Sequence, residues 1–400
     1  MSSQVEKLVL VPKLRFPECR NTKWVGKLLG EVAPLQRGFD LPSDMLRHGK
    51  IPVVYSNGVQ KYHEIGMASA PGLVTGRSGT IGKLHFVEEG EYWPHNTSLW
   101  VTGFKGNVPR FVYYLYDSIG MNRFSSGSGV PTLNRNDVHA FSSSIPESLA
   151  EQQKIADCLS SLDELIAAQA RKVDALKTHK KSLMQQLFPR EGETQPRLLF
   201  PDFQKGAKWK TKKLGTLLMD TPRPIDMDEG TQYSLVTVKR RYGGVVSREI
   251  LKGKNIKVKS QFLVESNDFL ISKRQIVHNA CGLVPKELEG SIVSNEYSVL
   301  TANKDCDVRF FNYFAQQPSV SQSFMQASVG IVIEKMLFKL GFWLKQEFLF
   351  PGFEEQQRIA DCLTSLDDLI TFQTQALETL KTHKKGLMQQ LFPAARGVAE

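Results

Sequence analysis

The sequence predicts an α/β (α+β) protein in which two tandem mixed α/β domains are separated by two long helices that form an antiparallel coiled coil. Residues 151–189 recur as residues 355–393, shifted by 204 positions, and 27 of the 39 aligned pairs are identical. Each copy carries a seven-residue apolar repeat, and the segments outside the copies alternate short β-rich runs with Gly and Asn turns. A duplication of this kind indicates two similar halves related by a pseudo-twofold axis.

Each repeated segment predicts a long helix with a coiled-coil seam. Two rows of residues recur every seven positions, offset from each other by four. No Gly or Pro interrupts residues 155–187, and at ~1.5 Å per residue such a helix is about 50 Å long. The seam residues predicted to pair the helices are Ile155, Leu159, Leu162, Ile166, Gln169, Val173, Leu176, Leu183 and Leu187 in the first copy, and Ile359, Leu363, Leu366, Ile370, Gln373, Leu377, Leu380, Leu387 and Leu391 in the second.

Polar residues interrupt both seams at matching positions. They are Gln169 and Lys180 in the first copy, and Gln373 and Lys384 in the second. Antiparallel pairing would set Gln169 near Gln373, where two amides could satisfy each other and fix the register. The alternative is that each helix is amphipathic and is buried against its own domain.

The duplication extends over whole halves of the chain. Both halves open with Pro-basic-Leu-x-Phe-Pro-acid, followed by a tryptophan (Trp24, Trp209) and a Leu-Gly step. Polar, breaker-rich residues 189–196 are typical of a linker. The expected boundaries are 1–150 for the first domain, 151–189 for the central helix, 190–350 for the linker and second domain, 351–393 for the distal helix and 394–400 for a tail.

Between opener and helix, the two halves agree in order but hardly in sequence. The β-rich runs are IPVVYS, GLVTGR and SLWVTG in the first half, and YSLVTV, GGVVSR, DFLISK and YSVLTA in the second. A short aromatic helix is expected at FVYYLYDS and again at RFFNYFAQ. A retained framework with a divergent surface is what two domains that recognise different targets would need.

Composition narrows the class of protein. The 400 residues predict two or three domains, and a net charge of +10 with a pI near 9.2 favours an anionic partner. No apolar run approaches the roughly 18 residues that cross a bilayer, and the first residues do not resemble a signal peptide. The five cysteines are widely spaced and predict neither disulfides nor a zinc site. We therefore expect a soluble cytoplasmic protein.

Segments that resemble catalytic or nucleotide-binding motifs do not have the spacing that those motifs require. In GRSGTIGKL, Gly76 and Gly82 are separated by five residues and Leu84 follows Lys83, whereas a phosphate-binding loop needs four residues and then Ser or Thr. A turn between strands is the better interpretation. The chain has no Asn-Pro dipeptide, so the Asn-Pro-Pro-aromatic motif of amino-methyltransferases is absent, and its eight histidines form no i, i+4 pair. We predict no catalytic residue and no metal ligand.

Basic residues at turns predict contacts with DNA. A Gly-Gly turn presents Lys239, Arg240, Arg241 and Tyr242, which could reach phosphates and guanine edges. The segment ISKRQ adds Lys273 and Arg274, and VTGRSG places Arg77 in the equivalent position of the first half. For each of these residues, the alternative is a solvated surface charge.

The repeated helix motif carries a family resemblance. EQQKIADCLSSLDELIA…LKTHKKSLMQQLFP, its second copy, the opener KLRFPE…W…KLLGEV and the run IVSNEYSVL resemble type I restriction-modification specificity (S) subunits over essentially the whole chain. One departure lies near the end of the second domain, where IVIEKMLFKLGF replaces the Gly-Val-Pro-Thr-Leu of residues 129–133.

The resemblance implies a role without chemistry on this chain. Two target-recognition domains would each read one half of a bipartite, asymmetric double-stranded DNA target, and the paired helices would set the gap between the halves. Two methyltransferase (M) subunits would dock on the repeated segments and methylate adenine with S-adenosylmethionine. Restriction (R) subunits would use ATP and Mg for translocation and cleavage. The chain itself would bind no cofactor.

Two other classes of protein remain open from the residues. A stand-alone, sequence-specific DNA-binding protein could use the coiled coil for self-association and would bind DNA tightly without M subunits. An enzyme, such as a fused nuclease or methyltransferase, would need an active-site motif that the sequence does not contain.

Overall fold

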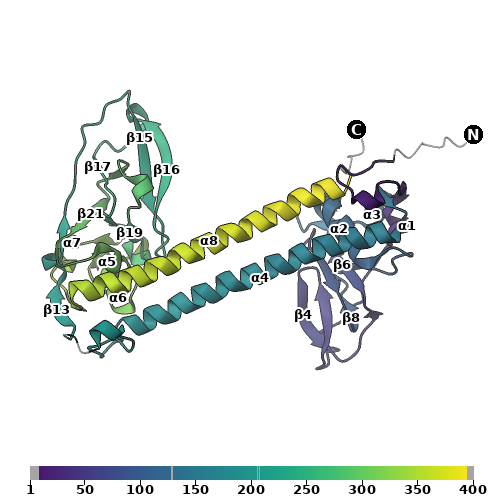
Figure 1. Cartoon of the computed structure of the whole chain (residues 1–400), viewed down its shortest axis with the longest axis horizontal. Coiled ribbons are helices and arrows are strands. Elements are labelled where there is room, and N and C mark those ends of the chain that lie inside the picture. Colours follow the sequence, from purple (N-terminus) through teal and green to yellow (C-terminus); the bar gives the residue numbers. More distant parts are fainter. Residues whose placement is uncertain (1–8, 128, 205, 207, 394–400) are drawn as a thin grey trace, which may run out of the picture. The chain divides into compact units, whose positions relative to one another are not determined.

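The computed structural model describes residues 9–127, 129–204, 206 and 208–393 (Figure 1). The chain divides into two compact units. Unit 1 comprises Met1–Arg171 and Gln375–Glu400, and unit 2 comprises Lys172–Thr374. Each unit therefore contains one mixed α/β domain together with part of each long helix. The tail expected at 394–400 lies outside the described residues.

Unit 1 contains two four-stranded sheets. One has the order β2-β9-β6-β7 and the other β4-β3-β8-β5, in which β3 and β8 run parallel. The strands are β1 (Trp24–Leu28), β2 (Leu35–Arg37), β3 (Ile51–Tyr55), β4 (Gly58–His63), β5 (Ala68–Ser69), β6 (Gly72–Gly76), β7 (Leu84–Val87), β8 (Glu91–Pro94), β9 (Ser98–Val101), β10 (Ser125–Ser126), β11 (Thr132–Leu133) and β12 (Ser142–Pro146). The short helices are α1 (Leu29–Val32), α2 (Pro109–Ile119) and α3 (Arg135–Ala140).

Unit 2 repeats this topology strand for strand. Its four-stranded sheets have the orders β14-β21-β18-β19 and β16-β15-β20-β17, with β15 and β20 parallel. The strands are β13 (Lys210–Lys213), β14 (Leu218–Asp220), β15 (Gln232–Val238), β16 (Val245–Lys252), β17 (Gln261–Leu263), β18 (Phe269–Ser272), β19 (Cys281–Leu283), β20 (Ile292–Ser294), β21 (Tyr297–Ala302), β22 (Ser328–Val329), β23 (Leu337–Phe338) and β24 (Glu347–Phe350). The short helices are α5 (Val308–Phe314), α6 (Pro318–Gln326) and α7 (Leu340–Trp343).

Two long helices of 39 residues each pass through both units. They are α4 (Leu149–Leu187) and α8 (Phe353–Leu391). Within each unit the two helices pack against each other with opposite chain directions, because the early part of α4 lies with the late part of α8 in unit 1, and the reverse holds in unit 2. The predicted antiparallel pairing and the duplicated α/β architecture are thus confirmed, and each helix begins two residues before the repeated segment.

The hydrophobic cores join each domain to both helices. In unit 1 the aromatic face of α2 packs with Ile155 and Leu159 of α4 and with Leu391 of α8. In unit 2 the aromatic face of α5 packs with Leu187 and Ile359. Both predicted interpretations of the helices are therefore correct in part, since the ends of the seams are buried against the partner helix and against the domain.

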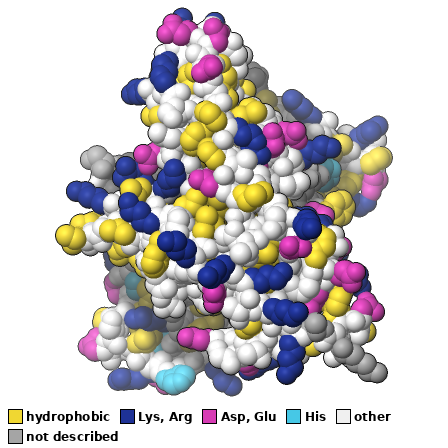
Figure 2. Space-filling view, turned by 90° about the vertical axis from the view of Figure 1, so that its left-hand side faces the viewer, with side chains coloured by type: hydrophobic (Ala, Val, Ile, Leu, Met, Phe, Trp, Pro, Cys, Tyr) yellow, Lys and Arg dark blue, Asp and Glu magenta, His cyan; other side chains and the backbone are white. Residues whose placement is uncertain are grey.

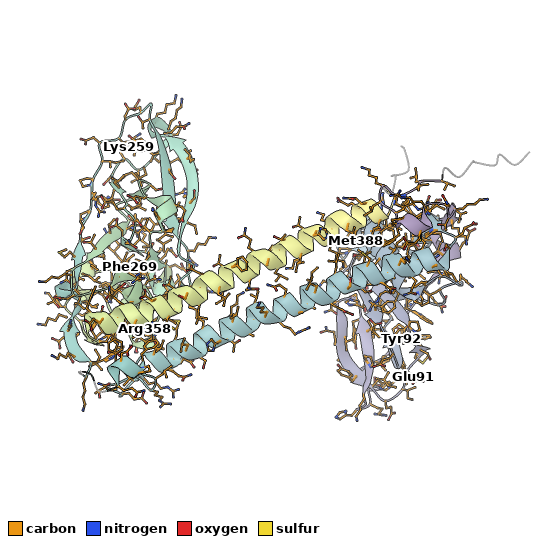
Figure 3. All side chains as sticks on the ribbon, viewed as in Figure 1. Glu91, Tyr92, Lys259, Phe269, Arg358 and Met388 are labelled. Atoms are coloured by element: carbon orange, nitrogen blue, oxygen red, sulfur yellow. The ribbon has the colours of Figure 1, made fainter. Side chains whose placement is uncertain are left out.

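Smaller clusters fill the outer sheets. Phe269 lies in the large core of unit 2, whereas Tyr92 lies in a separate cluster of unit 1 with Val54 and Val74 (Figure 3). The expected β-rich runs all form strands, and both short aromatic helices form as α2 and α5. The GRSGTIGKL segment connects antiparallel strands β6 and β7, as predicted for a turn between strands.

Candidate nucleic-acid interface

Arg77 follows the last residue of β6, where the chain turns away from the sheet. Its backbone N–H donates to the carbonyl of Thr97, at 2.9 Å. Its guanidinium Nη1 donates to the carbonyl of Asn96, at 3.3 Å. The half-buried side chain is therefore held at the loop between β8 and β9.

Lys273 occupies the same position in unit 2. Its backbone N–H donates to the carbonyl of Glu296, at 2.9 Å, and its ammonium Nζ donates to the carbonyl of Asn295, at 2.8 Å. The strand registers agree, because β6 ends at Gly76 opposite Ser98 and β18 ends at Ser272 opposite Tyr297. A cationic side chain that binds an asparagine carbonyl is thus present in both units at one place in the fold. The contact of Arg77 with DNA stays a prediction.

Arg274 lies next to Lys273 on the surface. Its Nε donates to the Glu296 carboxylate, at 2.7 Å, and both side chains are about half exposed. An exposed pair of this kind is worth little to stability, so a phosphate can compete for the guanidinium. Ser78 takes this position in unit 1, and the two units therefore differ in charge there.

The turn between β15 and β16, residues 239–244, is anchored at its centre. Arg241 and Tyr242 adopt left-handed backbone angles, with φ of 57° and 56°. Their N–H groups donate to the carbonyls of His278 and Asn279, at 2.8 and 2.9 Å. These two hydrogen bonds hold the turn against the segment that follows β18. Because Lys273 and Arg274 begin that segment, the turn lies beside them.

The side chain of Arg240 is oriented by its neighbours. Its Nε donates to Oε1 of Gln275, at 2.7 Å, and its Nη2 lies 3.4 Å from the Glu334 carboxylate. His278 Nε2 contacts the other oxygen of Glu334, at 3.1 Å. Arg240 is still 53% exposed, so the network directs the guanidinium without covering it.

Lys239 and Arg241 are exposed and have open head groups. Within the described part of the chain, neither side chain forms a hydrogen bond or ion pair. On the face drawn in Figure 2, Lys and Arg side chains are spread among acidic and hydrophobic ones rather than gathered into a single patch.

Tyr242 differs from its neighbours. The sequence placed it with the DNA-contacting residues, but its ring packs against the core cluster of unit 2 and its hydroxyl oxygen is buried. Burial raises the pKa of the Tyr242 phenol to about 12. We therefore assign Tyr242 to holding the turn and leave it out of the interface.

Among the described residues of unit 1, the connection equivalent to the basic turn is short. The equivalent strands β3 and β4 are joined by a two-residue turn at Ser56 and Asn57. Near Arg77 the sequence missed Asn96, whose amide donates to Asp40, and Arg37, which lies 3.1 Å from Asp40. The Asn96 hydrogen bond, together with the Arg37 charge, holds the pKa of Asp40 below its usual range. No spacing or motif marks these residues in the sequence.

The predicted seam residues all lie away from full exposure. The ten seam positions of α4 and the ten of α8, the two lysines included, are buried or half-buried, while most of the intervening helix positions are exposed. Central residues such as Leu162 and Ile370 are half-buried, and Gln373 is 8% exposed. The pairing of Gln169 with Gln373 stays a prediction.

The seam lysines have a partner in each unit. In unit 1 the ammonium of Lys384 on α8 lies 2.6 Å from the Asp163 carboxylate on α4. The same carboxylate accepts a hydrogen bond from the hydroxyl of Tyr114 on α2, at 2.7 Å, and Lys384 lies over the Tyr114 ring. The triad joins both helices to the domain.

Unit 2 repeats the triad with the helices exchanged. Lys180 on α4 lies 2.6 Å from Asp367 on α8, and the hydroxyl of Tyr313 on α5 donates to Asp367, at 2.7 Å. Burial raises the pKa of both tyrosines, Tyr114 and Tyr313. Sequence reasoning missed these triads, although two identical lysines at apolar seam positions are a signal of them.

In the part of the chain that the structure describes, neither a metal centre nor a membrane span accompanies these sites. In the described residues, no three His, Cys, Asp or Glu side chains gather as metal ligands. None of the helices there has an apolar stretch long enough to cross a bilayer.

Comparison with known proteins gives the family. The Type I restriction modification DNA specificity domain matches residues 21–178 and 207–382, which include both α/β domains and most of both long helices. The chain belongs to this family.

Individual relatives are distant. A protein of Methanocaldococcus jannaschii assigned as the MjaX type I restriction enzyme specificity subunit is 25% identical over 260 residues, which are 61% of this chain and 56% of that relative. The match thus spans about half the length of the relative.

Solved structures share the fold. The type I restriction-modification S subunit from M. genitalium covers 97% of this chain and 100% of its own, with a TM-score of 0.64 and 13% identity. A chain from a structural study of complex assembly and conformational transition in a type I R-M system covers 96% and 100%, with a TM-score of 0.53 and 16% identity.

Proposed function

We propose that this chain is the DNA specificity subunit of a type I restriction-modification complex, and that each unit reads one half of a bipartite, asymmetric DNA target. One observation carries the proposal. The two units repeat the same fold and each has a cationic side chain on an asparagine carbonyl, Arg77 and Lys273, but they surround it with different side chains. A retained frame with two different surfaces suits two different half-sites.

The basic side chains divide into two kinds of contact. Lys239 and Arg241 have open head groups, which suit phosphates, because a phosphate contact needs charge and reach more than orientation. Arg240 is directed by Gln275 and Glu334. An oriented guanidinium suits the two acceptors of a guanine edge in the major groove.

The helices supply spacing and docking in this proposal. Their repeated surfaces offer two equivalent sites, as two methyltransferase subunits require. Those subunits would methylate adenine with S-adenosylmethionine, and restriction subunits would use ATP and Mg to cleave unmodified DNA. This chain binds no cofactor, acts on double-stranded DNA in the cytoplasm, and contributes no catalytic residue.

Adenine-methylation mapping tests the proposal directly. Host DNA is sequenced for modified adenine with and without this gene, in the presence of the methyltransferase subunit. A split motif that vanishes on deletion is the expected result. Unchanged methylation, together with tight DNA binding by the isolated chain, would instead identify a stand-alone DNA-binding protein.

A further inference from the structure

Two small hairpins lie beside the repeated cation in the two units. In the β10–β11 hairpin of unit 1, the N–H of Leu133 donates a hydrogen bond to the carbonyl of Arg77, at 2.8 Å. In the β22–β23 hairpin of unit 2, the N–H of Phe338 donates to the carbonyl of Lys273, at 2.9 Å. Each hairpin is therefore fixed to the backbone of the cation-bearing residue. The departure from Gly-Val-Pro-Thr-Leu noted in the sequence leaves this bond in place.

The tips of the two hairpins expose apolar side chains. In unit 2, Ile331 is fully exposed, at 104%, and Val332 and Ile333 are 53% and 52% exposed. In unit 1, Val130 is 66% exposed. Single exposed apolar residues are ordinary, but three consecutive branched ones at the tip of an anchored turn call for a ligand.

The surroundings of the unit 2 tip select the ligand. Glu334, the next residue, accepts from Arg240 and contacts His278. The tip is thus tied to the network that directs the proposed guanine-reading guanidinium, and Lys335 follows on its other side. The Glu334 carboxylate is occupied by Arg240 and His278. Cationic side chains beside an apolar tip match a DNA groove, where phosphates flank the edges of the bases.

One apolar group is displayed in that groove. The C5-methyl of thymine is the hydrophobic feature of the major groove, and apolar side chains read it by contact. We propose that residues 331–333 form a base-reading tip for thymine methyl groups in the half-site of unit 2. This inference rests on the proposed function and adds to it the residues and the chemical group that are read.

The difference between the tips fits two half-sites. Unit 2 presents Gly-Ile-Val-Ile-Glu-Lys-Met between β22 and β23, whereas unit 1 presents a shorter tip with Val130 before Pro131. The anchoring strands correspond in their pairing, so the difference in length falls in the part that would touch bases. The tip of unit 2 can cover more than one methyl group, whereas among the described residues of the unit 1 tip Val130 is the exposed branched apolar side chain.

Uracil substitution tests the proposal at the level of one methyl group. Duplexes carrying the mapped motif are prepared with each thymine of the unit 2 half-site replaced by uracil. Binding is measured for the full chain assembled with its methyltransferase subunits. The parent complex should lose about fourfold in affinity at one or more positions, the worth of roughly one buried methyl group.

A triple variant separates the tip from the rest of the interface. In Ile331→Ser, Val332→Ser, Ile333→Ser the thymine and uracil duplexes should bind equally. Ile250→Ser changes another exposed apolar residue of unit 2, 65% exposed on β16, and should keep the parent's preference for thymine. Because all four side chains are exposed, the variants should unfold at the parent's temperature.

Three results would overturn the inference. The first is that no uracil substitution changes the affinity of the parent complex. The second is that the triple variant keeps the parent's preference for thymine. The third is that the triple variant loses the methyltransferase subunit but still discriminates between DNA sequences, which would make the tip a protein contact. If the parent complex recognised no split sequence at all, the proposed function would fail first and this inference with it.

Discussion

Lys384 on α8 forms an ion pair with Asp163 on α4, and the two atoms that meet are 2.6 Å apart. The lysine side chain is 16% exposed and the aspartate 39%, so the pair is partly shielded from water. Lys180 and Asp367 form the same pair in unit 2, with 18% and 40% exposure. A charged residue at an apolar seam position thus has a specific partner on the facing helix.

Lys384→Met should destabilise unit 1 by about 1–3 kcal/mol, since it leaves the half-buried Asp163 with only its tyrosine donor. Lys180→Met should do the same in unit 2. Thermal unfolding and limited proteolysis of each variant would measure the loss. Lys381→Met is the matched control, because its exposed pair with Glu378 should contribute less than ~1 kcal/mol. Equal effects of Lys384→Met and Lys381→Met would contradict the role of the pair.

A second repeated residue has different partners in the two units. Glu151 accepts from Trp24 and from two nitrogens of Arg15, at 2.8 and 2.7 Å. Glu355 accepts from Trp209, at 3.1 Å, but leucine replaces the arginine in the second opener. Burial raises the pKa of Glu355, against the smaller opposing effect of the Trp209 hydrogen bond.

Glu355→Gln should therefore stabilise unit 2 at neutral pH. A carboxyl whose folded pKa is raised contributes stability below its ordinary pKa and loses that contribution as pH rises through the folded value. Glutamine keeps an acceptor for Trp209 and carries no charge. The melting temperature should rise by about 2 °C at pH 8, and the gain should shrink toward pH 5.

Glu151→Gln is the matched substitution in unit 1 and should act in the opposite direction. It leaves the guanidinium of Arg15, whose side chain is 11% exposed, without its counter-charge. The expected loss is roughly 3 kcal/mol. Melting curves between pH 5 and 8 for both variants would give the signs, and a stabilising Glu151→Gln would show that the Arg15 pair does not hold the opener.

The architecture could be predicted from the sequence because the duplication is visible in local sequence patterns. The seven-residue repeat, the Gly-bounded strands and the aromatic helices each depend on neighbouring residues, and the structure confirms them. The triads join residues far apart in the chain, so periodicity shows only that Lys180 and Lys384 break the seam. The packing of the Tyr242 ring against the core depends on distant residues too, since the backbone N–H groups of residues 241 and 242 bond to the segment after β18.

Arg241→Ala should weaken binding without changing the sequence that is read. A phosphate contact contributes equally on all sequences, and its loss should reduce the salt dependence by about one ion. Binding to specific and random duplexes, measured across a salt series, checks this. Arg248→Ala on β16 removes another exposed arginine, away from the turn, and should leave both quantities unchanged.

Arg240→Ala should instead relax the preference at one position of the unit 2 half-site. A directed guanidinium on a guanine is worth about 1–3 kcal/mol of discrimination. Methylation mapping of cells that carry the variant would show the relaxed position, with the half-site of unit 1 intact. A uniform loss across all sequences would place Arg240 on the phosphates.

Exchange of a whole domain should change one half of the target and nothing else. The segment 198–350 begins beside the end of α4 and closes on itself, because β13 pairs antiparallel with β24, with Lys210 opposite Phe350. Its replacement by the equivalent segment of another family member leaves both long helices intact. Methylation mapping should show a new second half-site, the original first half-site and the original gap.

The reciprocal exchange of 12–146 should change the other half. This segment is closed in the same way by β1 and β12, with Trp24 opposite Pro146. A change in gap length after either exchange would mean that the α/β domains, and not the helices, set the spacing.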